Sequence, residues 1–266
     1  MTAKEFRTEV VEAFARKRLL VADGNAKTVK GRAKGYMTGI MYLAPADEAG
    51  RGTVCSMSSA GCREACLFTA GHGRFDSVRD ARITKTNLWF DDRKAFMHNL
   101  ILDIISVVEK AEREGLTPCI RLNGTSDIMW EKQKYKGKTL FQWFPDLQFY
   151  DYTKIWTRFS KKLPDNYHLT FSRSEENDAL IAKVLRLAPD ANVAVVFSGE
   201  LPETWNGMEV INSDQDDLRF LDPKGVVCGL KAKGDAKKDK SGFVVQYQLM
   251  DIVPLGKKKK VEAAAA

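Results

Sequence analysis

The stretch HLTFSRSEENDALIAKVLRLAP, residues 168–189, decides the fold class of this chain. Its first four residues form a strand-like run, and Ser174 behind them is a residue type that caps helices. Apolar residues then recur at helical spacing: Leu180, Ile181, Val184 and Leu187. Pro189 marks the end of this helical pattern. The stretch therefore predicts one βα unit, a strand that leads into a helix.

Strand-like runs recur along the rest of the chain, with helical or loop segments between them. The runs are residues 36–43, 119–122, 147–150, 193–197, 209–211, 226–230 and 243–247. Helical patterns cover residues 4–20, 79–90 and 92–114. Strands that alternate with helices favour βα units and a parallel sheet. We predict a single α/β domain over residues 1–256, with its sheet partly or fully closed into a TIM-like barrel.

The composition is that of a globular protein with a full-sized core: 266 residues, 44% hydrophobic and 29% charged. Neither a run of 18 apolar residues nor a signal peptide occurs, so we expect a cytoplasmic protein without a membrane partner. The net charge of +7 is concentrated in Lys231–Lys240 and in residues 257–266, which we expect to be a disordered basic and alanine-rich tail. Only the lysine-rich loop favours a nucleic acid partner.

Polar side chains gather just after three of the predicted strands. They are Asn123, Ser126 and Asp127 after the first, Asp151, Tyr152 and Lys154 after the second, and Ser172, Arg173 and Glu175 after the third. The carboxyl ends of parallel strands are where barrels and open α/β sheets bind ligands. The alternative is that each is a turn former or helix cap, because loops are polar for that reason alone. As a group they predict a substrate pocket.

Three cysteines follow the first long strand-like run with the spacing C-x6-C-x3-C: Cys55, Cys62 and Cys66. In a reducing cytoplasm such a group argues for metal ligation rather than for disulfides. Thiolates suit iron–sulfur clusters and zinc, and the small residues between the first two cysteines let the loop wrap closely around a cluster. The alternative is three cysteines buried independently, but free cysteines do not usually cluster in a polar segment.

Zinc is the main competitor of a cluster at this motif. Structural zinc takes four ligands, usually from CxxC-like pairs, and the motif has no such pair. A fourth ligand would be His72, Cys119 or Cys228, and the last two lie in apolar runs that predict core packing. We therefore favour a [4Fe–4S] cluster on three cysteines, with one iron open. An open iron can bind S-adenosylmethionine or act as a Lewis acid on a substrate.

The order of elements is also informative. A strand, a cysteine loop, a helix and then further βα units is the order found in radical S-adenosylmethionine enzymes, so a radical-SAM-like partial barrel is expected. The cysteine spacing of those enzymes is C-x3-C-x2-C, and this chain departs from it. The element order therefore favours S-adenosylmethionine as a second cofactor, whereas the spacing does not.

Five further segments form a specific combination: GCREACL at 61–67, TAGHGR at 69–74, RDARI at 79–83, RLNGTSD at 121–127 and FYDYTK at 149–154. Together they resemble the bacteriophage gene product 88 family, over roughly residues 35–233. The resemblance implies a phage-encoded protein that acts in the host cytoplasm, with the three cysteines as the signature of the family. It supplies no substrate and no activity.

The first function that the sequence predicts is an iron–sulfur enzyme acting on a small molecule by radical or hydrolytic chemistry. Cys55, Cys62 and Cys66 are its metal ligands. The catalytic candidates are Asp151 or Glu175 as acid or base, and Lys154 or Arg173 as the group that binds an anion. The substrate-binding candidates are Asn123, Ser126, Asp127, Tyr152, Ser172 and Arg173.

The second function belongs to another class. It is a binding module, stabilised by a cluster or by zinc, that contacts nucleic acid or a host protein through Lys231–Lys240 and surface aromatic residues. Charge runs are usually solvated loops, and the nearly neutral remainder of the chain favours the enzyme.

Overall fold

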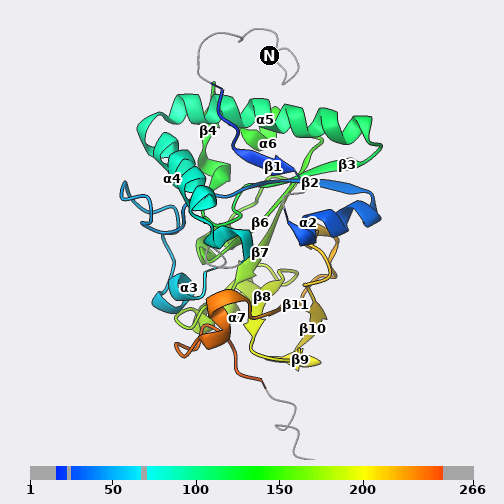
Figure 1. Ribbon diagram of the computed structural model, residues 1–266. Coiled ribbons are helices and arrows are strands. Elements are labelled where there is room, and N and C mark those ends of the chain that lie inside the picture. The colour runs from blue at the N-terminus through cyan, green and yellow to red at the C-terminus, as the bar shows by residue number, and fades with distance from the viewer. Residues whose placement is uncertain (1–15, 23–24, 67–70, 248–266) are drawn as a thin grey trace, which may run out of the picture.

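The computed structural model describes residues 16–22, 25–66 and 71–247. Its centre is a nine-stranded sheet in the order β1-β2-β3-β6-β7-β8-β11-β10-β9 (Figure 1). The strands are β1 (Leu20–Ala22), β2 (Tyr36–Met41), β3 (Thr117–Arg121), β6 (Gln148–Thr153), β7 (Tyr167–Ser172), β8 (Val193–Phe197), β9 (Thr204–Trp205), β10 (Met208–Asn212) and β11 (Val227–Lys231). A second, two-stranded sheet pairs β4 (Lys134–Tyr135) with β5 (Lys138–Thr139).

The strands between β2 and β10 in this order run parallel to their neighbours. Antiparallel pairs occur only at the ends of the described sheet, where β1 meets β2 and β9 meets β10. The carboxyl ends of the parallel strands therefore lie at one edge, here called the carboxyl edge. The predicted α/β class with a parallel sheet is confirmed.

Helices connect the strands, and the longest of them, α5, covers one face of the sheet. Those described are α2 (Ala26–Gly31), α3 (Ala60–Glu64), α4 (Asp76–Asp91), α5 (Arg93–Arg113), α6 (Leu140–Trp143) and α7 (Asp178–Leu187). Helix α5 packs on β2 and β3, and α4 packs on α5, at the top of Figure 1. Asp92 caps α5 by accepting a hydrogen bond from the Ala95 N–H at 2.9 Å. The predicted apolar stripe of α5 is buried: Phe96, Leu100, Ile101, Ile104 and Val107.

The two faces of the sheet differ in chemistry. Tyr167, Leu169 and Phe171 on β7 belong to the main hydrophobic core, which includes the stripe of α5. His168 and Thr170 alternate with them and so lie on the other face. The short 3-10 helix Arg219–Leu221, in the connection from β10 to β11, contacts β6 and β7 there. We call this second side the polar face.

Two predictions about the sheet need correction. The fully closed form of the predicted barrel is wrong, because β1 and β9 lie at opposite ends of the strand order and leave the sheet open. Residues 243–247 make a single bridge, from Val245 to Phe197, instead of a strand. The reason is local, since the N–H groups of Phe243 and Val244 donate to the side chains of Ser241 and Asp239, at 3.2 and 2.9 Å.

Other differences concern helix starts and the chain ends. Ser174 does not cap α7, because the Asn177 side chain accepts a hydrogen bond from its N–H at 2.7 Å and the helix begins at Asp178. Of the helix predicted over residues 4–20, residues 4–15 lie outside the described chain, and Leu20 begins β1. The predicted tail at 257–266 also lies outside it. No helix of the described part has the length and hydropathy needed to cross a bilayer.

Candidate functional site

The cysteine loop, residues 55–66, lies between β2 and α4 in the chain and next to the carboxyl edge of the sheet. Cys55 is half-buried, and its sulfur donates a weak hydrogen bond to the carbonyl of Thr125, 3.7 Å away in the segment after β3. Next to it, the Asp127 N–H donates to the Val54 carbonyl at 2.8 Å. The Thr125 hydroxyl bonds the Leu43 carbonyl, at the end of β2. The first cysteine is thus tied to the end of the neighbouring strand.

The second part of the loop is fastened by Glu175, which follows β7. One carboxylate oxygen of Glu175 accepts a hydrogen bond from the Gly61 N–H, and the other accepts one from the Ser59 hydroxyl, both at 2.8 Å. Ser59 is in turn the N-cap of α3, because its oxygen accepts from the Cys62 N–H at 3.2 Å. Glu175 therefore holds the turn that presents Cys62.

Gly61 makes this contact possible because it has no side chain. A Cβ atom at this position would overlap the Ser241 hydroxyl and would lie 2.7 Å from Glu175 Oε1. Cys62 packs beside a small apolar cluster that contains Ala65, Phe243 and Val244. The loop is thus enclosed between the end of β7 and the segment 241–244.

The three thiols share one electrostatic environment. Burial raises the pKa of Cys55 to about 12, and the negative charges of Asp127, Cys66 and Cys62 add to this effect. Burial lowers the pKa of Arg82, and the negative charge of Cys66 partly opposes this shift. All three cysteines are half-buried and free of disulfides. Three soft sulfur donors on one loop fit a thiolate-bound metal group.

The described residues do not form a complete set of metal ligands. Among them, no three His, Cys, Asp or Glu side chains are already grouped as ligands of one ion. The side chain of His72 is outside what the structure describes. Cys119 and Cys228 are fully buried, as predicted, in strands β3 and β11. The Cys228 thiol also donates to an Asp222 carboxylate oxygen at 3.4 Å.

Several of the predicted pocket residues are linked in one network below the cysteine loop. The Lys154 N–H donates to Asp127 Oδ2 and the Lys154 ammonium donates to the Ser172 hydroxyl, both at 2.8 Å. Ser126 donates to the side-chain oxygen of Asn123 at 2.9 Å. Residues from the ends of β3, β6 and β7 thus meet at the carboxyl edge, beside the segment that holds Cys55.

Arg173 is fully engaged in structural contacts. Its guanidinium makes a two-point ion pair with Asp178, at 2.7 and 2.9 Å. It also donates to the carbonyls of Gly242 and Phe243. Arg173 therefore attaches the segment 241–244 to the start of α7, and Lys154 is the better placed of the two predicted anion-binding residues.

Asp151 and Tyr152 are neighbours on β6, so their side chains lie on opposite faces of the sheet. Asp151 is fully buried and accepts hydrogen bonds from the Asn123 N–H at 2.6 Å and the Tyr167 hydroxyl at 2.8 Å. Burial raises its pKa to about 7. Tyr152 lies on the polar face, where the Arg121 guanidinium covers its ring at 4.6 Å. The two residues therefore do not meet in one pocket.

The raised pKa of Asp151 predicts a pH-dependent stability. The folded state holds its proton up to about pH 7, whereas the unfolded carboxyl loses it near 3.8. This contribution is complete below the unfolded value and is lost as the pH rises through the folded one. We compare the unfolding free energy of the native protein with that of Asp151→Asn. The difference, native minus variant, is expected to fall between about pH 4 and pH 8, by at most about 1.4 kcal/mol per pH unit. Urea unfolding at several pH values measures it, and parallel profiles would contradict it.

The sequence did not predict the polar face. One guanidinium nitrogen of Arg121, Nη1, donates to both carboxylate oxygens of Asp217, at 3.0 and 2.9 Å, and the Tyr150 hydroxyl also donates to Asp217 at 3.1 Å. Arg219 pairs with Asp216 and Asp222. The sequence did contain one indication of this face: Arg121 is a charged residue between apolar ones in a strand-like run, so its side chain needs a partner on the opposite face of the sheet. These contacts hold the connection between β10 and β11 against the sheet.

The family model described as gene product 88 matches residues 18–247. The chain belongs to the gene product 88 family. No curated protein and no solved structure matches the chain. The gene product 88 match spans the sheet, the cysteine loop and the segment 241–244. It confirms the resemblance to this family that the sequence segments indicated.

Proposed function

We propose that this bacteriophage-family chain is a [4Fe–4S] protein in which Cys55, Cys62 and Cys66 are the ligands, and that it is an enzyme of the host cytoplasm. The observation that carries the proposal is the fastening of the cysteine loop. Glu175 holds the turn of Cys62, and the segment after β3 holds Cys55. A loop with three half-buried thiols, fixed at the carboxyl edge, is what a cluster site in a parallel sheet requires.

The chain's own residues would position a substrate beside the thiols. When bound, a three-cysteine cluster would supply an open iron that binds a small ligand, such as a substrate or S-adenosylmethionine. Lys154 offers an ammonium group held by Ser172, suited to an anionic group of the substrate. Asp127, with one oxygen bound to the Lys154 N–H, lies between that lysine and Cys55 in the network. Asp151 and Glu175 are occupied by structural hydrogen bonds, so any proton transfer by them would have to break these bonds.

The topology supports a radical-SAM-like partial barrel as the more specific form of the proposal. The parallel strands β2, β3, β6, β7 and β8 are neighbours in chain order, and the cysteine loop follows the first of them. The cysteine spacing remains different from that of those enzymes. Radical and hydrolytic chemistry are both compatible with an open iron.

The binding-module alternative has less support from the lysine-rich loop. The Lys231 ammonium pairs with Glu200 at 2.8 Å, and that of Lys233 pairs with Asp214 at 2.7 Å. Both charges are therefore partly neutralised by the protein itself, which weakens the attraction for a polyanion.

Iron analysis tests the proposal. We expect anaerobically reconstituted protein to be brown, with a broad absorption at roughly 400 nm and about four iron and four sulfide ions per chain. Serine in place of Cys55, Cys62 or Cys66 should remove most of the iron, because each thiolate is a ligand. Adding S-adenosylmethionine to the reduced protein should change its electron paramagnetic resonance spectrum if the open iron binds it.

Cys119→Ser is the matched control, because this buried thiol contacts Thr38 and the Met37 carbonyl on β2 rather than residues of the cysteine loop. Its iron content should equal that of the native protein. Loss of iron in Cys119→Ser or Cys228→Ser, with none in the motif variants, would refute the ligand assignment. A colourless protein with one zinc ion per chain would refute the cluster.

A further inference from the structure

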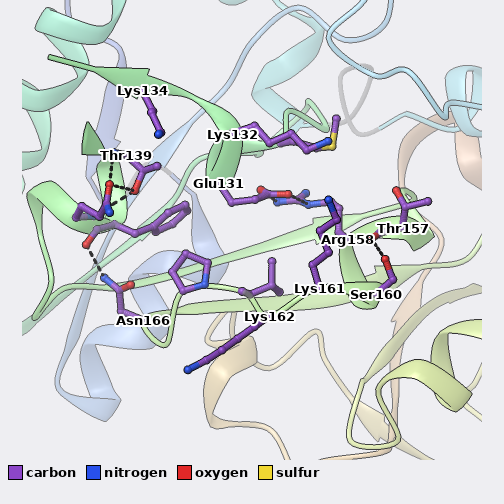
Figure 2. Close-up of a pocket in the computed structure, with 15 residues that line it drawn as sticks. Glu131, Lys132, Lys134, Thr139, Thr157, Arg158, Ser160, Lys161, Lys162 and Asn166 are labelled. Carbon is purple, nitrogen blue, oxygen red and sulfur yellow. Dashed lines mark hydrogen bonds and ion pairs between the residues drawn. The ribbon is translucent and has the colours of Figure 1, made fainter. Parts of the chain in front are cut away.

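A pocket of about 870 Å³ lies away from the cysteine loop, between two connections of the sheet. One connection joins β3 to β6 and supplies residues 129–142, and the other joins β6 to β7 and supplies residues 157–166. The volume lies within the range of about 300–1,000 Å³ that is usual for small-molecule sites. Figure 2 shows the polar and charged side chains that surround it. None of the cysteines lines this pocket.

The pocket is strongly basic. Its lining contains five cationic side chains, Lys132, Lys134, Arg158, Lys161 and Lys162, and one acidic side chain, Glu131. The acid is already used, because Glu131 makes a two-point ion pair with the buried Arg158 guanidinium, at 3.0 and 2.7 Å. Four lysine charges therefore remain around the pocket.

Three of these lysines have no acidic partner among the residues that the structure describes. Lys162 pairs with Asp165 at 3.2 Å, on the surface. For Lys132, Lys134 and Lys161 the described part of the chain places no carboxylate within 4.0 Å of the ammonium group. Like charges around one concavity repel each other, and an anion bound between them removes that repulsion. Lysine ammonium groups are common ligands of phosphate.

Four apolar residues among the uncharged lining suit the organic part of a ligand, and polar side chains such as Thr139 and Gln142 lie beside them. Met129, Leu163 and Pro164 line the pocket beside Phe141, whose ring stacks on Tyr167 at 4.3 Å between centroids. Phe141 is 3% exposed, so it does not offer the open ring face on which successive bases of a nucleic acid strand would stack. An apolar surface next to several unpaired cations fits one small molecule with a charged end and an apolar or planar end.

We propose that this pocket binds a phosphorylated small molecule of the nucleotide class. Its phosphate groups contact Lys132, Lys134 and Lys161, and its base lies against Met129, Leu163 and Pro164. The site is separate from the proposed cluster and does not depend on it. Arg158 links the two, because it lines the pocket and also pairs with Asp127 at 3.4 Å.

Isothermal titration of the full chain with ATP and with inorganic triphosphate tests the proposal. We expect ATP to bind more tightly than triphosphate, because only ATP also contacts the apolar lining. We expect affinity to fall as salt is added, because the lysines are exposed and screened. Lys132→Ala combined with Lys134→Ala should weaken ATP binding at least tenfold, since two phosphate contacts are lost.

The matched control is Lys237→Ala combined with Lys238→Ala. These exposed lysines belong to the lysine-rich loop, so the control removes the same net charge from another surface. It should leave ATP affinity within about twofold of the native value. An equal loss in both double variants, or no binding of ATP at millimolar concentration, would overturn the proposal. So would an oligonucleotide that binds this pocket more tightly than ATP, because the occupant would then be a strand.

Discussion

Replacing Gly61 with alanine is expected to displace the cysteine loop and to remove most of the bound iron. The added Cβ would overlap the Ser241 hydroxyl and would lie 2.7 Å from Glu175 Oε1. Either the loop or the segment 241–244 must move, and this movement is expected to weaken the two hydrogen bonds of Glu175. Overpacking of this kind costs about 1–3 kcal/mol of folding free energy. Urea unfolding and iron analysis of Gly61→Ala measure the two effects.

A second substitution separates the steric cause from a general loss of stability. Ser241→Gly removes both the hydroxyl and the Cβ of Ser241, the latter 2.8 Å from the added methyl group. Gly61→Ala combined with Ser241→Gly should therefore bind more iron than Gly61→Ala alone. Gly31→Ala is the control, because its nearest neighbour is Leu218 at 3.6 Å, an ordinary contact. A Gly61→Ala protein with native iron content would show that the loop does not depend on this close approach.

Replacing Arg158 with methionine is expected to cost about 3–5 kcal/mol of unfolding free energy. The guanidinium is 1% exposed and pairs with Glu131 and Asp127, and it donates to the Tyr167 hydroxyl at 2.8 Å. Methionine fills much of the volume but leaves two partly buried carboxylates without a cation. Urea unfolding at neutral pH gives the loss, which should shrink at acidic pH as Asp127, whose pKa is raised by burial, takes up a proton.

The matched comparison for this effect uses an exposed ion pair. Lys224 pairs with Asp190 at 2.9 Å, and both side chains are more than 70% exposed. Lys224→Met should change the unfolding free energy by less than about 1 kcal/mol. Combining Arg158→Met with Glu131→Gln should recover part of the loss, since one unpaired charge is removed. The loss of unfolding free energy in Arg158→Met could instead be unchanged by Glu131→Gln and the same at every pH. That result would mean that lost packing, rather than unpaired charge, destabilises the variant.

The parallel sheet could be predicted from the sequence because its strands and helices have clear periodicity. The runs at 168–171 and 193–197 became β7 and β8, and the helix predicted at 92–114 became α5. The run at 243–247 has the same apolar character but lies next to Asp239 and Ser241, whose side chains take its N–H groups. Local side-chain competition of this sort is not visible in a hydrophobic pattern.

The candidate site was predictable in outline but not in its contacts. The cysteines were found from their spacing in a polar segment, and the residues after β3, β6 and β7 because parallel strands end at one edge. Glu175 was predicted as an acid or base, whereas its carboxylate binds Gly61, 114 residues earlier in the chain. The placement of Tyr152 away from Asp151 follows from strand alternation and could have been inferred. The basic pocket was missed because its lysines come from two loops that each look like ordinary polar surface.

The fastening of the cysteine loop by later residues sets an order of events during protein synthesis. The three thiols leave the ribosome more than a hundred residues before Glu175, and the segment with Ser241 and Phe243 follows later still. Until these residues are synthesised, the loop lacks the hydrogen bonds of Glu175 and the packing of the segment 241–244. Its thiols are then exposed to oxidation and to any soft metal ion in the cell. If the loop holds the proposed cluster, its iron is therefore expected to be delivered after translation is nearly complete, and correct metallation would then depend on the timing of delivery as well as on affinity.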